Sequence, residues 1–151
     1  MTYVVLKLLH LLAVVVWIGG VTALSVVTGR LIVARDRATL GALFPHSMAY
    51  GQRMAGPSSI LVLITGVWMM IAGKITPHAF WIIWGFLGII VHFVFGATIM
   101  RKRGMAFAKL VSTPGSDEEL AAAGARLRIA NLIYLLIMIS VIGAMVLKPT
   151  F

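Results

Sequence analysis

Four long apolar stretches, each bracketed by basic side chains, constrain this sequence more than any other feature. They cover about residues 8–29, 54–73, 79–100 and 129–147 of the 151. An α-helix needs ~20 residues to cross the ~30 Å hydrocarbon core of a bilayer. Only 11% of the residues are charged, against about 25% in a soluble domain. The sequence therefore predicts an all-α, polytopic membrane protein: one domain over residues 1–151, folded as an antiparallel bundle of four transmembrane helices.

The basic residues are distributed unevenly between the two ends of these predicted helices. Four of the 13 lysines and arginines lie around residues 30–53 and six around 101–128, whereas three lie near the termini and the 74–78 connection. Because cationic loops stay in the cytoplasm, we expect a bacterial-type inner (plasma) membrane protein with these two connections inside and both termini outward. The net charge of +9 then reflects which connections lie in the cytoplasm. The expected partners are therefore membrane lipids and not nucleic acid.

Few residues could support catalysis. The chain has no cysteine, which excludes disulfides and thiol chemistry. The acidic residues all lie outside the predicted spans, and no nucleophile–base pair, phosphate loop or carboxylate pair occurs within them. The sequence thus predicts no catalytic residue and does not favour an enzyme. The acidic residues are Asp36, Asp117, Glu118 and Glu119.

Two segments between the spans carry helix signals of their own. Residues 38–53, which include Pro45, predict a helical lead-in to the second span that is bent or broken near Pro57. Ser116 and Glu119 fit a capping box, which predicts a helix that starts there and runs into the fourth span. Small residues along several spans permit close helix approach within the bundle or between two copies, so a homodimer stays open.

His10 lies in the apolar run "LKLLHLLAVVVWIGG". An unpaired polar group in hydrocarbon costs several kcal/mol, so the imidazole needs a partner. Imidazole is a common ligand of haem iron, and a helix bundle can enclose the macrocycle. We therefore expect His10 to bind the iron of one b-type haem (haem b), in a protein that transfers electrons or serves as a small subunit of a larger redox complex.

The second iron ligand stays open between His78 and His92. His78 begins the third span at nearly the expected depth of His10. His92 lies deeper and would reach the same iron only if the helices tilt. Two haems, with His46 folded back to join His92, agree less well in depth. Thioether alternatives near the depth of His10 are Met69, Met70 and Met145.

The histidines also have purely structural interpretations. His92 is at about the depth of Tyr134, and a hydrogen bond between them would make it a packing residue. His10 could reach water or Thr76, and His78 could be a loop or cap residue. The protein would then be a cofactor-free accessory membrane subunit, whose basic loops dock a partner or anionic lipids.

Residues 3–20, "YVVLKLLHLLAVVVWIGG", carry a family resemblance. The Leu-His followed by Trp-x-Gly-Gly resembles the opening helix of CopD copper-resistance membrane proteins, HemJ protoporphyrinogen oxidases and a neighbouring group of small, function-unassigned integral membrane proteins. The stretch "LITGVWMM" at 63–70 resembles the second helix of that unassigned group. The resemblance therefore implies a small membrane protein of this CopD/HemJ-like kind.

The named relatives imply different chemistry. HemJ-like enzymes bind haem b through the histidine that corresponds to His10, and His92 falls near their later Tyr-His pair. They also use a lysine near the start of the third helix, where this chain reads "HAFWIIW", so porphyrinogen oxidation is not supported. CopD-like proteins are associated with copper movement. Cu(I) prefers thioether and imidazole ligands, and the nine methionines keep a copper-handling protein as an alternative.

Overall fold

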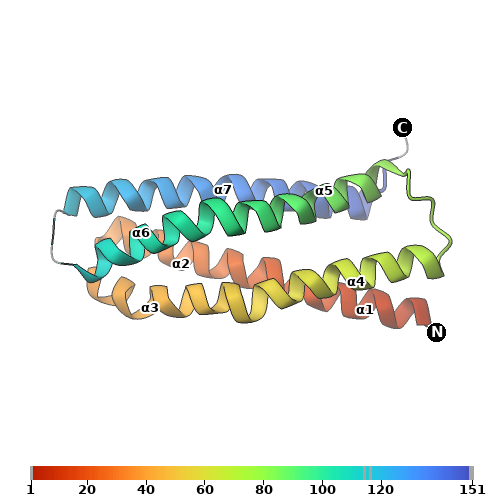
Figure 1. Ribbon diagram of the computed structural model, residues 1–151, viewed down its shortest axis with the longest axis horizontal. Helices are drawn as coiled ribbons and strands as arrows, with labels where there is room; N and C mark the ends of the chain where they lie inside the picture. Colours follow the sequence, from red (N-terminus) through yellow and green to blue (C-terminus); the bar gives the residue numbers. More distant parts are fainter. Residues whose placement is uncertain (1, 114, 116, 150–151) are drawn as a thin grey trace.

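The computed structural model describes residues 2–113, 115 and 117–149, which form four long helices (Figure 1). The first, Thr2–Ala34, contains α1 (Thr2–Val14), a π-helical turn η1 (Val15–Gly19) and α2 (Gly20–Ala34). The second, Arg37–Ala72, contains α3 (Arg37–Tyr50), η2 (Gly51–Ala55) and α4 (Gly56–Ala72). The third, Phe80–Ser112, contains α5 (Phe80–Phe95), η3 (Gly96–Met100) and α6 (Arg101–Ser112). The fourth is α7 (Asp117–Leu147).

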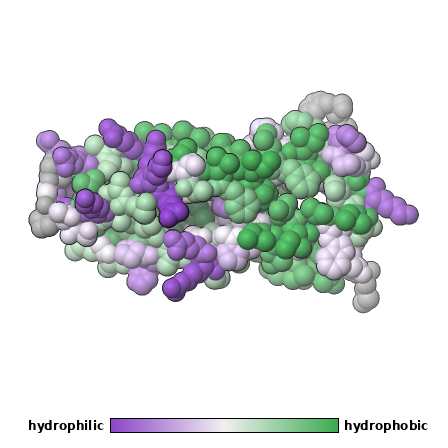
Figure 2. Space-filling view, in the orientation of Figure 1, coloured by the Kyte–Doolittle hydropathy of each residue, from purple (hydrophilic) through white to green (hydrophobic). Residues whose placement is uncertain are grey.

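The four helices run antiparallel (Figure 1). The α2–α3 turn, the end of α6 and the start of α7 lie at one end, which we call the basic end. The start of α1, the end of α7 and the connection at 73–79 lie at the other, which we call the terminal end. Figure 2 shows hydrophilic side chains gathered toward the basic end and apolar ones over the terminal half. Each helix is long and apolar enough to cross a membrane, so the prediction of an all-α four-helix membrane bundle is confirmed.

The helices extend beyond the apolar stretches. They contain 31 to 36 residues, about 47–54 Å at 1.5 Å per residue, whereas the hydrocarbon core is ~30 Å thick. Beyond the basic residues that bracket the spans, α6 and α7 each continue for 11 residues, the second helix begins 16 residues before Arg53, and α2 continues for four. Three of the four helices therefore extend roughly 17–24 Å past the basic residues that bracket their spans, and they form a projection at the basic end.

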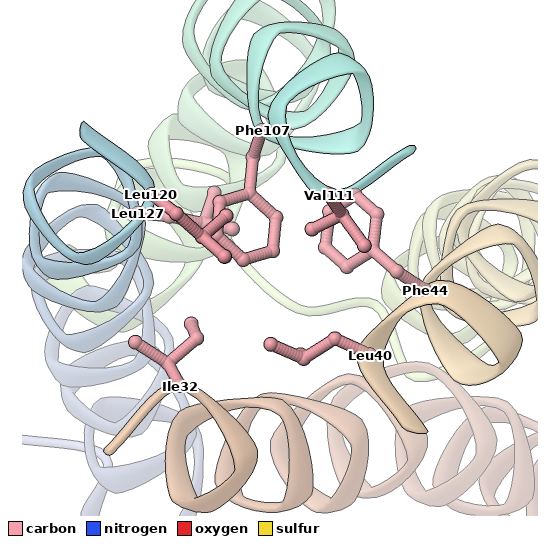
Figure 3. Close-up of a cluster of buried hydrophobic side chains, with 7 residues drawn as sticks. All are labelled: Ile32, Leu40, Phe44, Phe107, Val111, Leu120 and Leu127. Carbon is pink, nitrogen blue, oxygen red and sulfur yellow. The ribbon is translucent and has the colours of Figure 1, made fainter. Parts of the chain in front are cut away.

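A separate hydrophobic core fills this projection. Side chains from α2, α3, α6 and α7 point toward one another there (Figure 3). The rings of Phe44 and Phe107 meet edge to face with centroids 4.9 Å apart, and Phe107 is completely buried. Such packing is that of a water-soluble helix bundle. The cluster comprises Ile32, Leu40, Phe44, Phe107, Val111, Leu120 and Leu127.

Arg37 joins three elements at the basic end. Its guanidinium donates from Nε to the Val111 carbonyl at 3.1 Å and also to the Leu110 and Thr113 carbonyls at the end of α6. It pairs with Asp117 in the first turn of α7, with Nη1 and Oδ1 3.4 Å apart. One side chain thus satisfies helix-terminal carbonyls that have no backbone partner. The capping residue predicted for this helix, Ser116, lies outside the described residues.

Three helices contain a π turn that the sequence analysis missed. Of the bend or break expected near Pro57, the break is absent, because the chain stays helical from Arg37 to Ala72, and η2 ends two residues before that proline. A proline ring crowds the preceding turn and removes an N–H, and a π turn is one way for a helix to continue through such a site. At η1, Tyr50 donates its hydroxyl to the Val16 carbonyl, and its ring lies against Gly20.

Contacts differ between the two halves of the bundle. Near its middle, a second core contains Ala13, Trp17, Ala55, Val62, Tyr134 and Met138. In the terminal half, α1 packs along α4, and α5 packs along α7. These two helix pairs contact each other chiefly through α4 and α5. The buried polar side chains described next lie at the second core and in this terminal half.

Candidate functional site

His10, on α1, is half-buried against α4. Its Nδ1 lies 2.9 Å from Oγ1 of Thr65, and the Thr65 hydroxyl donates to the Leu61 carbonyl at 2.6 Å. Because a hydroxyl has one proton, Oγ1 accepts a hydrogen bond from Nδ1–H of His10. The imidazole is therefore protonated on Nδ1, and its Nε2 carries a lone pair. The partner is Thr65, and neither water nor Thr76 is needed to satisfy Nδ1.

A glycine on α4 makes room for this ring. A β-carbon at Gly66 would lie 3.3 Å from Cε1 of His10, which is closer than ordinary van der Waals contact. The absence of a side chain at Gly66 lets the imidazole approach the backbone of α4. Thr65 and Gly66 together set the position of the ring, one by a hydrogen bond and the other by close packing.

His92, on α5, belongs to a second polar group. Its Nδ1 lies 2.7 Å from Oη of Tyr134 on α7, and Nε1 of Trp17 in η1 donates to the same oxygen at 3.1 Å. Because an indole N–H only donates, the Tyr134 hydroxyl accepts from Trp17, and its own proton, which meets no other acceptor among the described residues, donates to Nδ1 of His92. His92 is then protonated on Nε2. This contact confirms the expectation that His92 and Tyr134 share one depth.

The sequence analysis missed Trp17 as a polar partner. Its ring is edge-on to that of His92, with centroids 4.4 Å apart, and only 3% of the residue is exposed. A buried indole N–H needs an acceptor, and this need is the signal that could have found Trp17. With Tyr134 and His92 it links the first, third and fourth helices at mid-bundle.

The structure does not bring the predicted second ligands to His10. His92 contacts Trp17, which is seven residues after His10 on the same helix, so His92 lies about 10 Å nearer the basic end. His78 is an exposed residue of the 73–79 connection. Since Thr65 lies seven residues before the end of α4, His78 is roughly 10 Å nearer the terminal end. His46 is exposed on α3, outside this region.

Met145 is a sulfur ligand candidate at the depth of His10. Its Sδ lies 3.7 Å from the position of a β-carbon at Gly85 of α5. Gly85 lies seven residues, ~10 Å, from His92 toward the terminal end of the bundle. His10 also lies ~10 Å from His92 in that direction, so Met145 and His10 share one depth. Met69 and Met70 follow Thr65 by about one turn on α4. Within the described ranges, no three side chains from His, Cys, Asp and Glu gather as a metal site.

These features define an integral membrane protein with two hydrogen-bonded histidines inside a four-helix bundle. The chain matches the model of the DUF2269 family, described as a predicted integral membrane protein, over residues 4–149 and belongs to that family. The match supports the resemblance to small integral membrane proteins without singling out CopD or HemJ. No curated protein and no solved structure matches the chain.

Proposed function

We propose that this protein is a membrane redox protein that binds one b-type haem through Nε2 of His10 and transfers electrons alone or as a subunit of a redox complex. The hydrogen bond from Nδ1–H of His10 to Thr65 carries the proposal. Histidines that bind a metal through one nitrogen usually donate the other N–H to a protein acceptor, which fixes the tautomer and the ring. The resemblance of residues 3–20 to the HemJ opening helix supports the same ligand.

The depth of the side chains favours Met145 over His78 and His92 as the second ligand. The two histidines lie about 10 Å from His10 in opposite directions along the bundle, whereas Met145 packs on Gly85 at the level of His10. Imidazole and thioether together form a known ligand pair for haem iron, which exchanges one electron when bound. We therefore propose haem b with His10 as one ligand, oriented by Thr65, and Met145 as the other.

A visible spectrum of the purified protein, expressed with ample haem, tests the proposal. The expected result is a Soret band whose visible partners change between the oxidised and reduced states. His10→Ala removes the bound haem, whereas His46→Ala keeps it because His46 is exposed on α3. Met145→Leu keeps haem but changes the spectrum of the ligated iron. Absence of a Soret band in the wild type, or full haem content in His10→Ala, contradicts the proposal.

Copper handling is the second candidate, because an imidazole and a thioether at one depth also suit Cu(I). The CopD-like resemblance of the first helix favours it as well. Cu(I) titration distinguishes the two functions. A protein without haem that binds Cu(I), and loses it in both His10→Ala and Met145→Leu, is a copper protein. A protein that binds neither is a cofactor-free accessory subunit.

The proposed location is a bacterial-type inner membrane with the basic end in the cytoplasm. Four basic residues around 30–53 and six around 101–128 lie toward that end, against three at the terminal end. Cationic segments resist translocation. His10 and Met145 then lie in the half of the bilayer that faces away from the cytoplasm, where an electron partner outside the cell membrane could reach them.

A further inference from the structure

A groove of about 780 Å³ opens on the surface of the bundle between α2 and α7. Arg30 and Arg128 line it where the predicted spans meet the basic end, one on each helix. Toward the bilayer centre its walls carry Ser25 and Asn131, followed by apolar side chains such as Leu135. The groove thus places two cationic side chains at the membrane boundary beside a mostly apolar wall that also carries two polar side chains.

The arginine side chains are available to a ligand. Among the described residues, neither Arg30 nor Arg128 has a carboxylate within ion-pair distance, and the ion pair that forms near the basic end uses Arg37. The Arg128 stem lies across Gly29, with Nε 3.6 Å from the position of a β-carbon there. This packing holds the Arg128 guanidinium beside the groove. Two unpaired cations next to a medium of low dielectric constant attract an anion strongly.

We infer that this groove binds an anionic phospholipid, with its phosphate between Arg30 and Arg128 and an acyl chain along the apolar wall. Guanidinium groups bind phosphate oxygens in pairs of hydrogen bonds, and basic pockets between transmembrane helices bind acidic headgroups. A free phosphate ion would leave the apolar wall unfilled. A second copy offers no matching charge, because all four acidic residues lie at 36 and 117–119, outside the spans.

Native mass spectrometry of the protein from nanodiscs of mixed phosphatidylglycerol and phosphatidylcholine tests this site. We expect the wild type to retain phosphatidylglycerol preferentially and R30Q/R128Q to lose at least about tenfold of that affinity. The control R101Q/K102Q removes two charges from the same end, away from the groove, and keeps the preference. Equal loss in both pairs would mean general surface attraction and would overturn the inference.

A second pair of variants tests the groove without changing charge. Ala125→Trp fills it from α7, and Ala106→Trp places the same ring on an exposed site of α6. Ala125→Trp should release phosphatidylglycerol and Ala106→Trp should retain it, which supports the site even if R30Q/R128Q does not fold. Retention in Ala125→Trp overturns the inference. The inference is also overturned if the wild type forms a dimer without lipid and Ala125→Trp dissociates that dimer, because a second copy would then occupy the groove. These outcomes do not depend on haem.

Discussion

The hydroxyl of Tyr134 determines which ring nitrogen of His92 carries the proton. It accepts from Trp17 at 3.1 Å and is 2.7 Å from Nδ1 of His92. Its ring also stacks on that of Phe95 with centroids 5.5 Å apart. Removing the oxygen alone would leave two buried polar groups without a partner while the ring packing stays.

We predict that Tyr134→Phe lowers the free energy of unfolding by about 1–3 kcal/mol, the usual effect of leaving a buried donor or acceptor unpaired. Unfolding in detergent, followed by circular dichroism, measures the change. Tyr3→Phe serves as a control because Tyr3 lies near the terminal end, beside Gly73. Equal stability of Tyr134→Phe and the wild type would show that the hydrogen bonds contribute nothing net.

The sequence predicted one histidine partner and missed the other for a geometric reason. Counting residues from the span ends put His92 and Tyr134 at one depth, and these helices do meet there. The same count put His10 near the interface. In the structure Tyr3 lies beside Gly73, and His10 lies two turns further in, beside Thr65 and Gly66. The register between α1 and α4 depends on close packing at glycines, which hydropathy does not encode.

At the scale of the element, the start of α3 has a cap that responds to pH. The Asp36 carboxylate accepts hydrogen bonds from the hydroxyl of Thr39 at 2.6 Å and from its backbone N–H at 3.0 Å. The hydroxyl is the larger cause, and together these bonds lower the pKa of Asp36 below its usual value. A capping carboxylate also interacts favourably with the positive end of the helix.

We predict that Asp36→Asn makes stability less sensitive to acid. Because the folded pKa is depressed, the carboxylate contributes stability above its unfolded pKa of about 3.9 and loses it as the pH falls through the folded value. Asparagine still caps the helix but does not titrate. Melting temperatures of the two proteins between pH 6 and pH 3 should therefore converge or cross in acid. Parallel curves would contradict the role assigned to Asp36.

Two glycines on α7 offer a matched comparison of helix packing. A β-carbon at Gly124 would lie 2.6 Å from Cγ2 of Ile32 on α2, whereas one at Gly143 would meet nothing within 4 Å. We predict that Gly124→Ala destabilises the protein by about 1–3 kcal/mol through overpacking. Gly143→Ala should stabilise it by about 0.5–1 kcal/mol because alanine favours the helix. If Gly124→Ala and the wild type had equal melting temperatures, α2 would move away from α7 without loss of stability.

Element lengths were harder to predict than element type. Each apolar stretch marks one helix, and the lead-in at 38–53 is helical as expected. The helix at Arg101–Ser112 was missed, because hydropathy falls where basic residues begin. Its Phe107 and Val111 nevertheless face a common core with Phe44 and Leu40. Side chains that meet from four segments far apart in the chain create this core, and no single segment reveals it.

At the scale of the whole molecule, the two cores correspond to two environments. The cluster around Phe107 lies beyond the basic residues that bracket the spans, which we expect to lie outside the bilayer. The cluster around Trp17 and Tyr134 lies between the brackets. One continuous set of helices therefore links a membrane-embedded pair of histidines to a folded projection at the basic end. A partner that docks on the projection would contact the same rigid helices that hold His92.

The side of the membrane on which this projection lies determines which compartment each site serves. The sequence contains no cysteine, so single cysteines report their own positions. We predict that Thr76→Cys, in the exposed connection at the terminal end, reacts with a membrane-impermeant maleimide in intact cells. Ala122→Cys, exposed on α7 in the projection, should react only after the membrane is opened. The physical cause is the cost of moving cationic loops across the membrane.

A third position makes this labelling interpretable. Ile133→Cys, exposed on α7 between the brackets, should stay unlabelled in both conditions because lipid surrounds it. Labelling of Ala122→Cys in intact cells would reverse the topology and place the paired arginines of the groove in the outer leaflet. Labelling of both sites in intact cells would mean insertion in two orientations. With the predicted pattern, the cationic groove faces the cytoplasmic leaflet, where anionic lipids are concentrated, and His10 faces the opposite compartment.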